Sequence, residues 1–256
     1  MPAPRRIVSL CPSITETIVA LGGLKQLVAA TRFCVRPEGL LWGLPRIGGT
    51  KNPDLARILD LKPDLVFANQ EENRREDVEA LRDAGVEVLV SFPRTVSEVP
   101  AEIRRWALRL GSPAEGDALA RRLEGEIGAL EAAPRPPPFL YAYWIWKDPW
   151  MTVSDDTYIA DLIALAGGVN VYGREADRYP ETSPADSLTR GADVHFFPDE
   201  PFPFTADKHG AECERLFGSE RVRLFVSGDD FCWHGARTLD GLARVRALRA
   251  GFGTSS

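Results

Sequence analysis

The feature that most constrains the fold is one long helical pattern in the middle of the chain. Ser112–Glu115, with the sequence Ser-Pro-Ala-Glu, predicts a helix start with a capping box, in which the Ser112 side chain accepts the Glu115 amide and proline takes the first helical position. Apolar residues then recur at spacings of four, four and three at Leu119, Leu123, Ile127 and Leu130. The proline-rich run 134–138 ends the helix. A stiff helix over 112–133 therefore separates two similar lengths of chain.

Short β-rich runs alternate with helical patterns on both sides of this helix, which is typical of parallel α/β units. Before it we predict strands near 6–10, 27–30, 64–68 and 86–91, with helices near 13–21, 53–60, 73–84 and 97–110. After it we predict strands near 139–143, 193–197 and 222–226, with helices near 157–166, 205–217 and 237–250. The predicted fold class is α/β: two Rossmann-like lobes, 1–111 and 134–256, joined by the backbone helix 112–133, with a ligand cleft between them.

Composition and charge argue against several classes of protein. The 256 residues have a formal net charge of −6, and the arginines are scattered among acids, so we expect no nucleic-acid partner. No apolar stretch approaches the roughly 18 residues that a membrane-spanning helix requires, so we expect no membrane span. Two lobes of this size can each bury a core without help from a partner, and we expect a monomer.

The N-terminal sequence and the cysteines bear on compartment. Residues Met1–Arg6 run directly into the apolar Ile7–Leu10, with no signal region or cleavage site between them. We therefore expect a cytoplasmic protein if Met1 is the native start, and a periplasmic or extracytoplasmic one if a signal was removed. Four isolated cysteines stand at positions 11, 34, 213 and 232, and we expect free thiols in a chain of this size.

Candidate ligand-binding residues follow the predicted strands, because open parallel sheets bind ligands beyond the carboxyl ends of their strands. In the first lobe these candidates are Pro12, Ser13, Thr15, Arg36, Gly49, Thr50, Asn69 and Arg94. In the second lobe they are Trp146, Trp150, Phe204, Trp233 and His234. Aromatic faces stack on broad, flat ligands, while the amides and hydroxyls at a helix start and the two arginines suit polar ligand edges. This pattern favours a macrocyclic ligand.

The histidines and small motifs allow only limited chemistry. No CxxC, HxxxH or HExxH spacing is present, so we predict no closed metal site built from side chains. His195 lies in a predicted strand and is expected in the core, whereas His234 is expected either to ligate the metal of a chelate axially or to hydrogen-bond a polar ligand group. Neither a phosphate-binding loop nor a nucleophile elbow is complete, so we predict no catalytic residues and no enzyme activity.

Several segments carry a family resemblance. The segments 6–16 (RIVSLCPSITE), 47–54 (IGGTKNPD), 58–66 (ILDLKPDLV) and 156–170 (DTYIADLIALAGGVN), together with Arg178–Glu181, occur in the order found in one family. The chain resembles the helical-backbone (class III) periplasmic solute-binding proteins of ABC importers, and is most similar to their cobalamin-binding branch. The likeness covers nearly the whole chain.

This resemblance implies a metal-chelate ligand and no required cofactor. Cobalamin is the first expectation, and haem or a ferric siderophore is the alternative. It also implies an ABC importer permease that docks on acidic residues, for which we name Glu72, Glu76 and Asp230, with Asp229 or Glu200 as substitutes for the last. Because no signal region precedes Ile7, a cytosolic chelate-handling protein or a chelatase-like enzyme is a further alternative.

Overall fold

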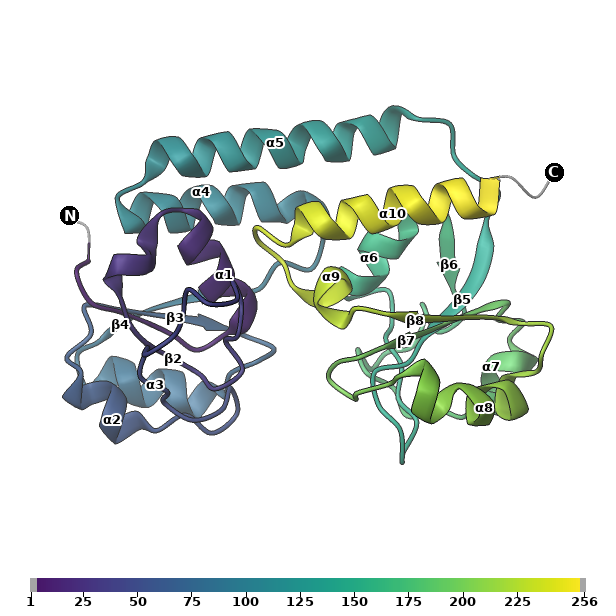
Figure 1. The fold of residues 1–256 in the computed structure, drawn as a ribbon, viewed down its shortest axis with the longest axis horizontal. Helices are drawn as coiled ribbons and strands as arrows, with labels where there is room; N and C mark the ends of the chain where they lie inside the picture. Colours follow the sequence, from purple (N-terminus) through teal and green to yellow (C-terminus); the bar gives the residue numbers. More distant parts are fainter. Residues whose placement is uncertain (1–3, 254–256) are drawn as a thin grey trace. The chain divides into compact units, whose positions relative to one another are not determined.

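The computed structural model describes residues 4–253 and divides into two compact units (Figure 1). Unit 1 contains the chain up to Pro93, Ser97–Gly125 and His234–Arg237. Unit 2 contains Arg94–Val96, Glu126–Trp233 and the chain from Thr238 onward. The boundary between the units therefore falls inside the long central helix. Two short segments, Arg94–Val96 and His234–Arg237, belong to a different unit from the residues on either side of them in the sequence. Met1–Ala3, part of the N-terminal run considered above, lie outside the described residues.

Unit 1 is built on a four-stranded parallel sheet with the order β2-β1-β3-β4. Its strands are β1 (Ile7–Ser9), β2 (Leu27–Ala30), β3 (Leu65–Asn69) and β4 (Glu87–Ser91). Its helices are α1 (Pro12–Ala20), α2 (Leu55–Asp60), α3 (Arg75–Asp83) and α4 (Val99–Leu110), with short 3-10 turns at Gly23–Gln26 and, in part, at Val96–Glu98. In Figure 1, α2 and α3 cover one face of the sheet, and α1 and α4 lie on the other.

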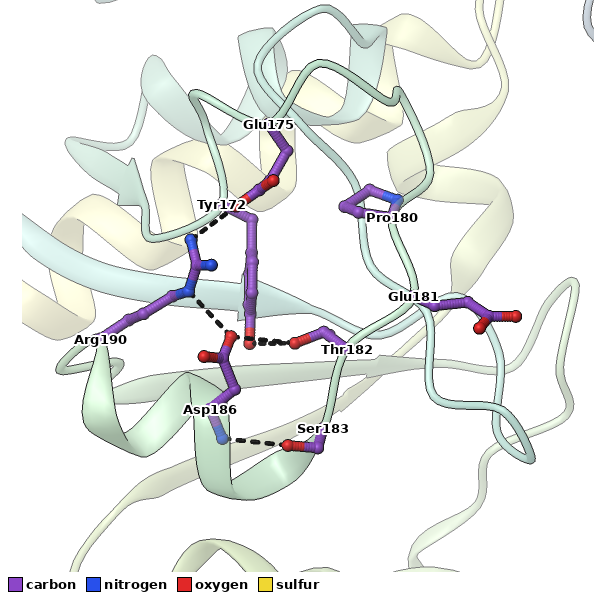
Figure 2. Close-up of a pocket in the computed structure, with 8 residues that line it drawn as sticks. All are labelled: Tyr172, Glu175, Pro180, Glu181, Thr182, Ser183, Asp186 and Arg190. Atoms are coloured by element: carbon purple, nitrogen blue, oxygen red, sulfur yellow. Dashed lines mark hydrogen bonds and ion pairs between the residues drawn. The ribbon is translucent and has the colours of Figure 1, made fainter.

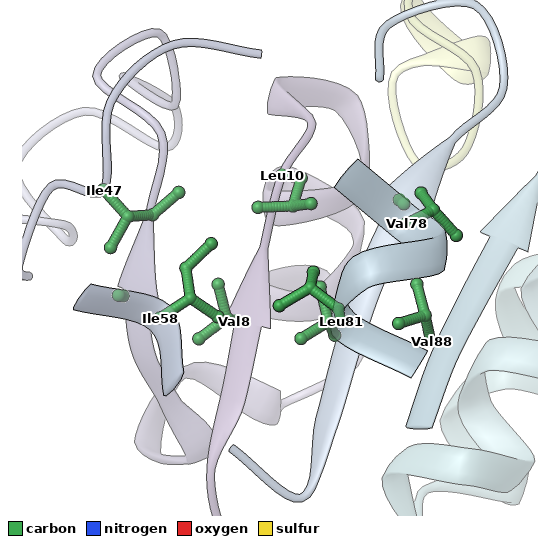
Figure 3. Close-up of a cluster of buried hydrophobic side chains, with 10 residues drawn as sticks. Val8, Leu10, Ile47, Ile58, Val78, Leu81 and Val88 are labelled. Carbon is green, nitrogen blue, oxygen red and sulfur yellow. The ribbon is translucent and has the colours of Figure 1, made fainter. Parts of the chain in front are cut away.

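The core of unit 1 follows the two-residue period of its strands. Val8 of β1 and Leu10, which follows β1, lie on the face covered by α2 and α3, where Ile58 and Leu81 meet them (Figure 3). Val66 of β3 belongs to the same buried cluster. Strands buried on both faces need apolar residues at nearly every position, and all five residues of β3 are buried. The sequence pattern therefore dictates the sheet, and the sheet fixes where its carboxyl ends lie.

Unit 2 repeats this plan with a four-stranded parallel sheet in the order β6-β5-β7-β8. Its strands are β5 (Phe139–Tyr143), β6 (Gly168–Asn170), β7 (Val194–Pro198) and β8 (Val222–Val226). Its helices are α6 (Tyr158–Ala164), α7 (Pro184–Thr189), α8 (Ala206–Phe217), α9 (Gly228–Cys232) and α10 (Thr238–Gly253). Figure 1 shows α7 and α8 on one face of this sheet and α6, α9 and α10 on the other.

Aromatic rings fill one face of the unit 2 sheet. Trp144, Phe197 and Phe217 are fully buried there, with the Trp144 and Phe217 ring centroids 5.3 Å apart. His195 is also fully buried and accepts a hydrogen bond from the Trp144 indole at 3.3 Å. The expectation that His195 is a core residue is confirmed, and Tyr141, Tyr143 and Trp144 are buried as well.

The central helix α5 (Pro113–Ala132) lies within one residue of the predicted 112–133 at each end, but it does not have the predicted cap. Leu123, Ile127 and Leu130 are buried and Leu119 partly so, which confirms the apolar stripe. The Ser112 hydroxyl, by contrast, is buried and has no hydrogen-bond partner in residues 4–253, so the capping box does not form. Gly116 allows the first turns of α5 to pack closely against α4, since a Cβ at Gly116 would come within 2.1 Å of the Ala107 Cβ on α4.

Three elements of unit 2 were not predicted. β6 and α7 are short, and propensity alone does not distinguish three to six residues from a loop. The segment Gly228–Cys232, predicted as a loop, forms the helix α9, whose first turn carries Asp229 and Asp230, where the helix dipole favours acids. The α/β class with two parallel-sheet units is confirmed. Within residues 4–253, no helix is both long and apolar enough to span a membrane.

Candidate ligand-binding site

The sheet orders locate a candidate site in each unit. In an open parallel sheet the ligand crevice lies where successive connections leave in opposite directions, beyond the carboxyl ends of the two strands concerned. The order β2-β1-β3-β4 places this switch point at β1 and β3, and the order β6-β5-β7-β8 places it at β5 and β7. The residues that follow these strands are therefore the first candidates for contact with a ligand.

In unit 1, the segment after β1 turns directly into α1. Pro12 occupies the first turn and is partly exposed, while Ser13 is 4% exposed and contacts the Cys11 sulfur at 3.3 Å. Thr15 is fully buried, and its hydroxyl lies 2.8 Å from the Ser9 hydroxyl and 3.0 Å from the Cys11 carbonyl oxygen. Thr15 therefore serves the local structure, and Pro12 is the residue of this turn that reaches the surface.

Asn69, at the end of β3, organises the neighbouring backbone. Its Oδ1 accepts hydrogen bonds from the amides of Glu71 at 2.8 Å and Glu72 at 3.1 Å, which fixes the orientation of the side-chain amide. Its Nδ2 is then directed toward the Ser91 carbonyl oxygen at 3.2 Å and the His234 Nε2 at 3.0 Å. Asn69 is 3% exposed, so its main contacts are with the protein.

His234 belongs to unit 1 although it follows the last strand of unit 2. Because the Asn69 amide donates, the His234 Nε2 must accept, and the ring is neutral with its proton on Nδ1. Burial lowers the pKa of His234 to about 4, and its ring lies 5.8 Å from that of Trp106. With one nitrogen protonated and the other accepting, this imidazole presents no lone pair to a metal. Axial ligation would require the Asn69 contact to break.

The loop between β2 and Arg46 displays apolar side chains on a fixed backbone. Phe33 is 48%, Val35 57%, Leu40 53% and Trp42 87% exposed. Arg46 donates to the carbonyl oxygens of Thr31 at 3.1 Å and Cys34 at 2.8 Å, which holds the loop in place. The loop is therefore anchored rather than collapsed onto the core.

Other predicted residues of unit 1 surround this apolar loop. Gly49 lies against Phe33, since a Cβ at Gly49 would come within 3.3 Å of that ring, and Thr50 is 8% exposed. The Arg32 guanidinium lies 4.8 Å from the centre of the Phe33 ring. Arg36 is partly exposed and forms an ion pair with Glu38 at 3.6 Å. This edge therefore combines apolar rings with guanidinium groups.

In unit 2 the predicted aromatic residues divide into surface and core. Trp146, beyond β5, is 41% exposed and packs edge-to-face on Phe202 at 5.6 Å. Trp150 is partly buried and stacks on Phe204 at 5.8 Å, and Phe204 is 2% exposed. Phe204 therefore has almost no free surface to offer a ligand, whereas Trp146 does.

Beyond β7 and β8, acidic groups come together with a tryptophan. Glu200 accepts a hydrogen bond from the Cys232 sulfur at 3.2 Å and another from the Trp233 side chain. Trp233 is 8% exposed. Burial, reinforced by Asp229 and Asp199, raises the pKa of Glu200 to about 7. This carboxyl group is therefore poised between its neutral and charged forms near neutral pH.

The residues named for transporter docking differ in accessibility. Glu72 and Glu76 are exposed, and both lie in unit 1. Asp230 is 5% exposed and accepts a hydrogen bond from Arg244 at 2.8 Å. It therefore links α9 to α10 and has little surface to offer a partner protein. Arg94 is exposed and pairs with Asp156 at 3.3 Å within unit 2.

A cavity of about 310 Å³ lies beside the end of β6 (Figure 2). Figure 2 shows the Arg190 guanidinium alongside the Tyr172 ring, 4.6 Å from its centre, with the Asp186 carboxylate and the Thr182 hydroxyl beyond it. Arg190 pairs with Asp186 and with Glu175, each at 2.8 Å. Two carboxylates therefore face the one guanidinium, and the exposed Glu181 also lines the cavity, so the charged lining is acidic overall.

All four cysteines are free thiols, as expected. Burial raises the pKa of Cys11 and Cys34 above the ordinary range and that of Cys213 to about 11, which keeps these thiols protonated and inert. No group of three or more histidine, cysteine or acidic residues among the described residues is arranged to hold a metal ion.

Two residues were missed as site candidates. Trp42 lies twelve residues beyond the end of β2, too far along the loop for the strand-end rule to indicate it, although a tryptophan in a loop with glycines and prolines is itself a signal. Glu200 was considered only for docking, because the neighbours that raise its pKa come from another strand end and cannot be seen in the sequence.

The model of the periplasmic binding protein family matches residues 7–199. A vitamin B12-binding protein of Vibrio parahaemolyticus is 28% identical over 192 residues, which are 75% of this chain and 70% of that protein. The crystal structure of the periplasmic vitamin B12-binding protein of Vibrio cholerae has a similar fold, with a TM-score of 0.85, 24% identity and coverage of 98% of this chain and 99% of the other. The apo structure of a periplasmic heme-binding protein from Roseiflexus sp. RS-1 has a TM-score of 0.77, 25% identity and coverage of 96% and 98%.

Proposed function

This chain belongs to the periplasmic binding protein family, and from that premise we propose that it captures a corrinoid of the vitamin B12 type for import. Its family consists of solute-binding proteins, and the chain is a binding protein and not an enzyme. The family alone does not select the ligand, so the choice of a corrinoid depends on the relatives and on the side chains at the strand ends.

The observation that carries the proposal is the display of exposed aromatic rings at strand-end loops. Trp42 is 87% and Phe33 48% exposed in unit 1, and Trp146 is 41% exposed in unit 2. Side chains of this kind are normally buried, and exposed apolar side chains gathered on one segment, as on the 33–42 loop of unit 1, mark a binding site. A corrin ring is broad and mostly apolar, so it can cover such rings and remove them from water.

Polar contacts would orient the ligand. We propose contacts from Pro12, Ser13, Gly49, Thr50 and Trp233 in addition to the exposed rings, with Arg36 and Arg94 directed to anionic groups such as the corrinoid phosphate. The costs of association and of ordering the loops offset much of the apolar gain. We therefore expect dissociation constants between about 1 nM and 1 μM.

Haem is a second candidate, and one observation favours it. Arg32 lies over the exposed Phe33 ring, and Arg36 is close by in sequence, so a ring with carboxylate side chains would find both stacking and charge pairing here. The 25% identical structure is described as heme-binding.

The remaining parts of the proposal concern partner and compartment. We propose that the protein acts outside the cytoplasm as a monomer and passes its ligand to an ABC importer permease. Glu72 and Glu76 are exposed acids suited to basic residues of such a permease. Because Asp230 is buried against Arg244, the exposed Asp199 is a better acidic candidate in unit 2.

The test is a titration of the purified protein with cyanocobalamin, haemin and a ferric hydroxamate siderophore. Tryptophan fluorescence, visible absorbance and the thermal midpoint are followed together. Saturable binding of cyanocobalamin below about 1 μM, tighter than that of the other two, supports the proposal. Tighter binding of haemin selects the second candidate, and no response to any of the three contradicts both.

Variants connect binding to the exposed rings. Trp42→Ala and Trp146→Ala should each weaken cyanocobalamin binding by roughly tenfold, because each removes a stacking surface. Leu108→Ala is the matched control, since Leu108 is 70% exposed on α4 and outside the strand-end loops. If the tryptophan variants bind as tightly as Leu108→Ala, the rings do not contact the ligand.

A further inference from the structure

Three strand ends of unit 2 converge on one carboxyl group. Tyr143 ends β5, Glu200 lies two residues beyond β7, and Gly228 begins α9 directly after β8. Gly228 lies so close that a Cβ there would be 2.9 Å from the Glu200 carbonyl oxygen and 3.1 Å from its amide nitrogen. Since β5 and β7 flank the switch point of this sheet, Glu200 stands where an open parallel sheet holds its ligand.

The position of Glu200 is fixed by its neighbours. The Gly228 amide donates to the Asp199 carboxylate at 2.7 Å, and the Cys232 sulfur and the Trp233 side chain donate to Glu200 itself. The charged and titratable groups that face it are Asp199 on the same loop, Asp229 and Cys232 on α9, and Tyr143 on β5. No basic group is among these neighbours, so the surroundings of Glu200 are acidic.

The Tyr143 hydroxyl supplies a second and independent observation. Tyr143 is 1% exposed, and its hydroxyl has no hydrogen-bond partner within the described part of the chain. After burial, the groups that act most strongly on the pKa of the Tyr143 hydroxyl are Cys232, Glu200 and Asp199, which places the hydroxyl in the electrostatic surroundings of the same cluster. A buried polar group without a partner costs roughly 1–3 kcal/mol, and a ligand or a water held with it can supply the missing bond.

We propose that Glu200, with the Tyr143 hydroxyl beside it, is a specificity site that accepts N–H groups of an uncharged, amide-bearing macrocycle and rejects macrocycles that carry carboxylates. The inference depends on the proposed function and goes beyond it, because it names the group that separates corrinoids from haem. Corrinoids carry primary amides around the ring, and each amide offers two N–H donors to a carboxylate. Haem carries two propionates, and a propionate placed beside Glu200 and Asp199 meets like charge without a compensating base.

The ionisation of Glu200 agrees with this role. Desolvation raises its pKa to about 7, so the carboxyl group is largely charged at pH 8. An amide donor hydrogen-bonds to the charged form and stabilises it, whereas a second carboxylate opposes it. The discrimination is therefore strongest above neutral pH.

The experiment compares two macrocycles on matched variants at pH 8. Dissociation constants for cyanocobalamin and haemin are measured with the wild type, Glu200→Gln, Glu200→Asp and Glu220→Gln. Glu220 is an exposed acid of unit 2, with 69% of its side chain accessible, so the last variant removes the same charge elsewhere. Thermal midpoints show that each variant is folded.

We expect Glu200→Gln to bind haemin at least fivefold more tightly, and to shift the haemin-to-cobalamin ratio of affinities at least tenfold toward haemin. Glu200→Asp keeps the charge and should keep the wild-type ratio within about threefold, and Glu220→Gln should leave it unchanged. The inference is overturned if Glu200→Gln and Glu220→Gln have the same haemin-to-cobalamin ratio of affinities. The proposed function stays intact in that case as long as both variants still bind cobalamin. A wild type that binds neither macrocycle overturns both.

Discussion

The Nε2 atom of His234 lies 3.0 Å from the Nδ2 atom of Asn69, which fastens a residue that follows β8 of unit 2 to the end of β3 in unit 1. Two further contacts secure the same segment. The Ala236 amide donates to the Thr17 hydroxyl at 3.0 Å, and Arg237 pairs with Glu16 at 3.0 Å. His234 therefore holds the returning chain, a structural role that the sequence did not reveal.

Loss of this hydrogen bond should reduce stability. We expect His234→Ala to lower the free energy of unfolding by about 1–3 kcal/mol, because it leaves the buried Asn69 amide without one of its partners. A double-mutant cycle with Asn69→Ala should show a coupling of about 1 kcal/mol in chemical denaturation. Any bound corrinoid should keep its visible spectrum in His234→Ala, and a spectral change would instead support axial ligation.

Stability should fall with acid because two histidines are buried in their neutral form. Burial lowers the pKa of both His195 and His234 to about 4, below the value of 6.5 in the unfolded chain. As the pH falls from 6.5 to 4, the unfolded chain binds these protons and the folded chain does not, so each histidine costs up to roughly 3 kcal/mol. Denaturation midpoints across this range should fall less steeply for His195→Gln than for the wild type. Equal slopes would show that His195 does not contribute.

Two glycines of α5 should respond to alanine in opposite directions. A Cβ at Gly116 would meet the Ala107 Cβ at 2.1 Å, so Gly116→Ala must separate α4 from α5 and should cost about 1–3 kcal/mol. A Cβ at Gly125 meets nothing within 4 Å, and Gly125→Ala should stabilise by up to about 1 kcal/mol through helix propensity. Urea denaturation of both variants measures this contrast, and a loss of stability in both would contradict it.

Removal of the Arg46 guanidinium should loosen the loop that displays Trp42. Arg46 donates charge-assisted hydrogen bonds to the carbonyl oxygens of Thr31 and Cys34, whereas the Thr31 oxygen otherwise accepts only the weaker bond from the Cys34 amide among the contacts of the described residues. We expect Arg46→Met to raise the rate of chymotrypsin cleavage within residues 33–42 at least fivefold. Arg57→Met, at an exposed position of α2, is the control. Cleavage at the same rate in both variants would mean that Arg46 does not anchor the loop.

The sequence by itself determined the elements and their class. The continuous apolar run of β3, the apolar stripe of α5 and the order of β-rich and helical runs are all local patterns, which are written in the order of residues. The predicted bounds of β2, β5 and β8 match the structure for the same reason. Trp146 could also be identified as a surface aromatic, because it lies beyond a strand whose position was already known.

Only the tertiary structure decided which strand-end residues are accessible and what they touch. Thr15, Phe204 and Asp230 all follow the strand-end rule, yet the packing around them buries each one. The pKa of Glu200 is about 7 because of its surroundings, which include Asp229 and Cys232 from another strand end. The Asn69–His234 contact joins residues that are 165 positions apart in the chain. Desolvation and hydrogen bonding depend on neighbours in space, so periodicity places a residue at a strand end without determining its chemistry there.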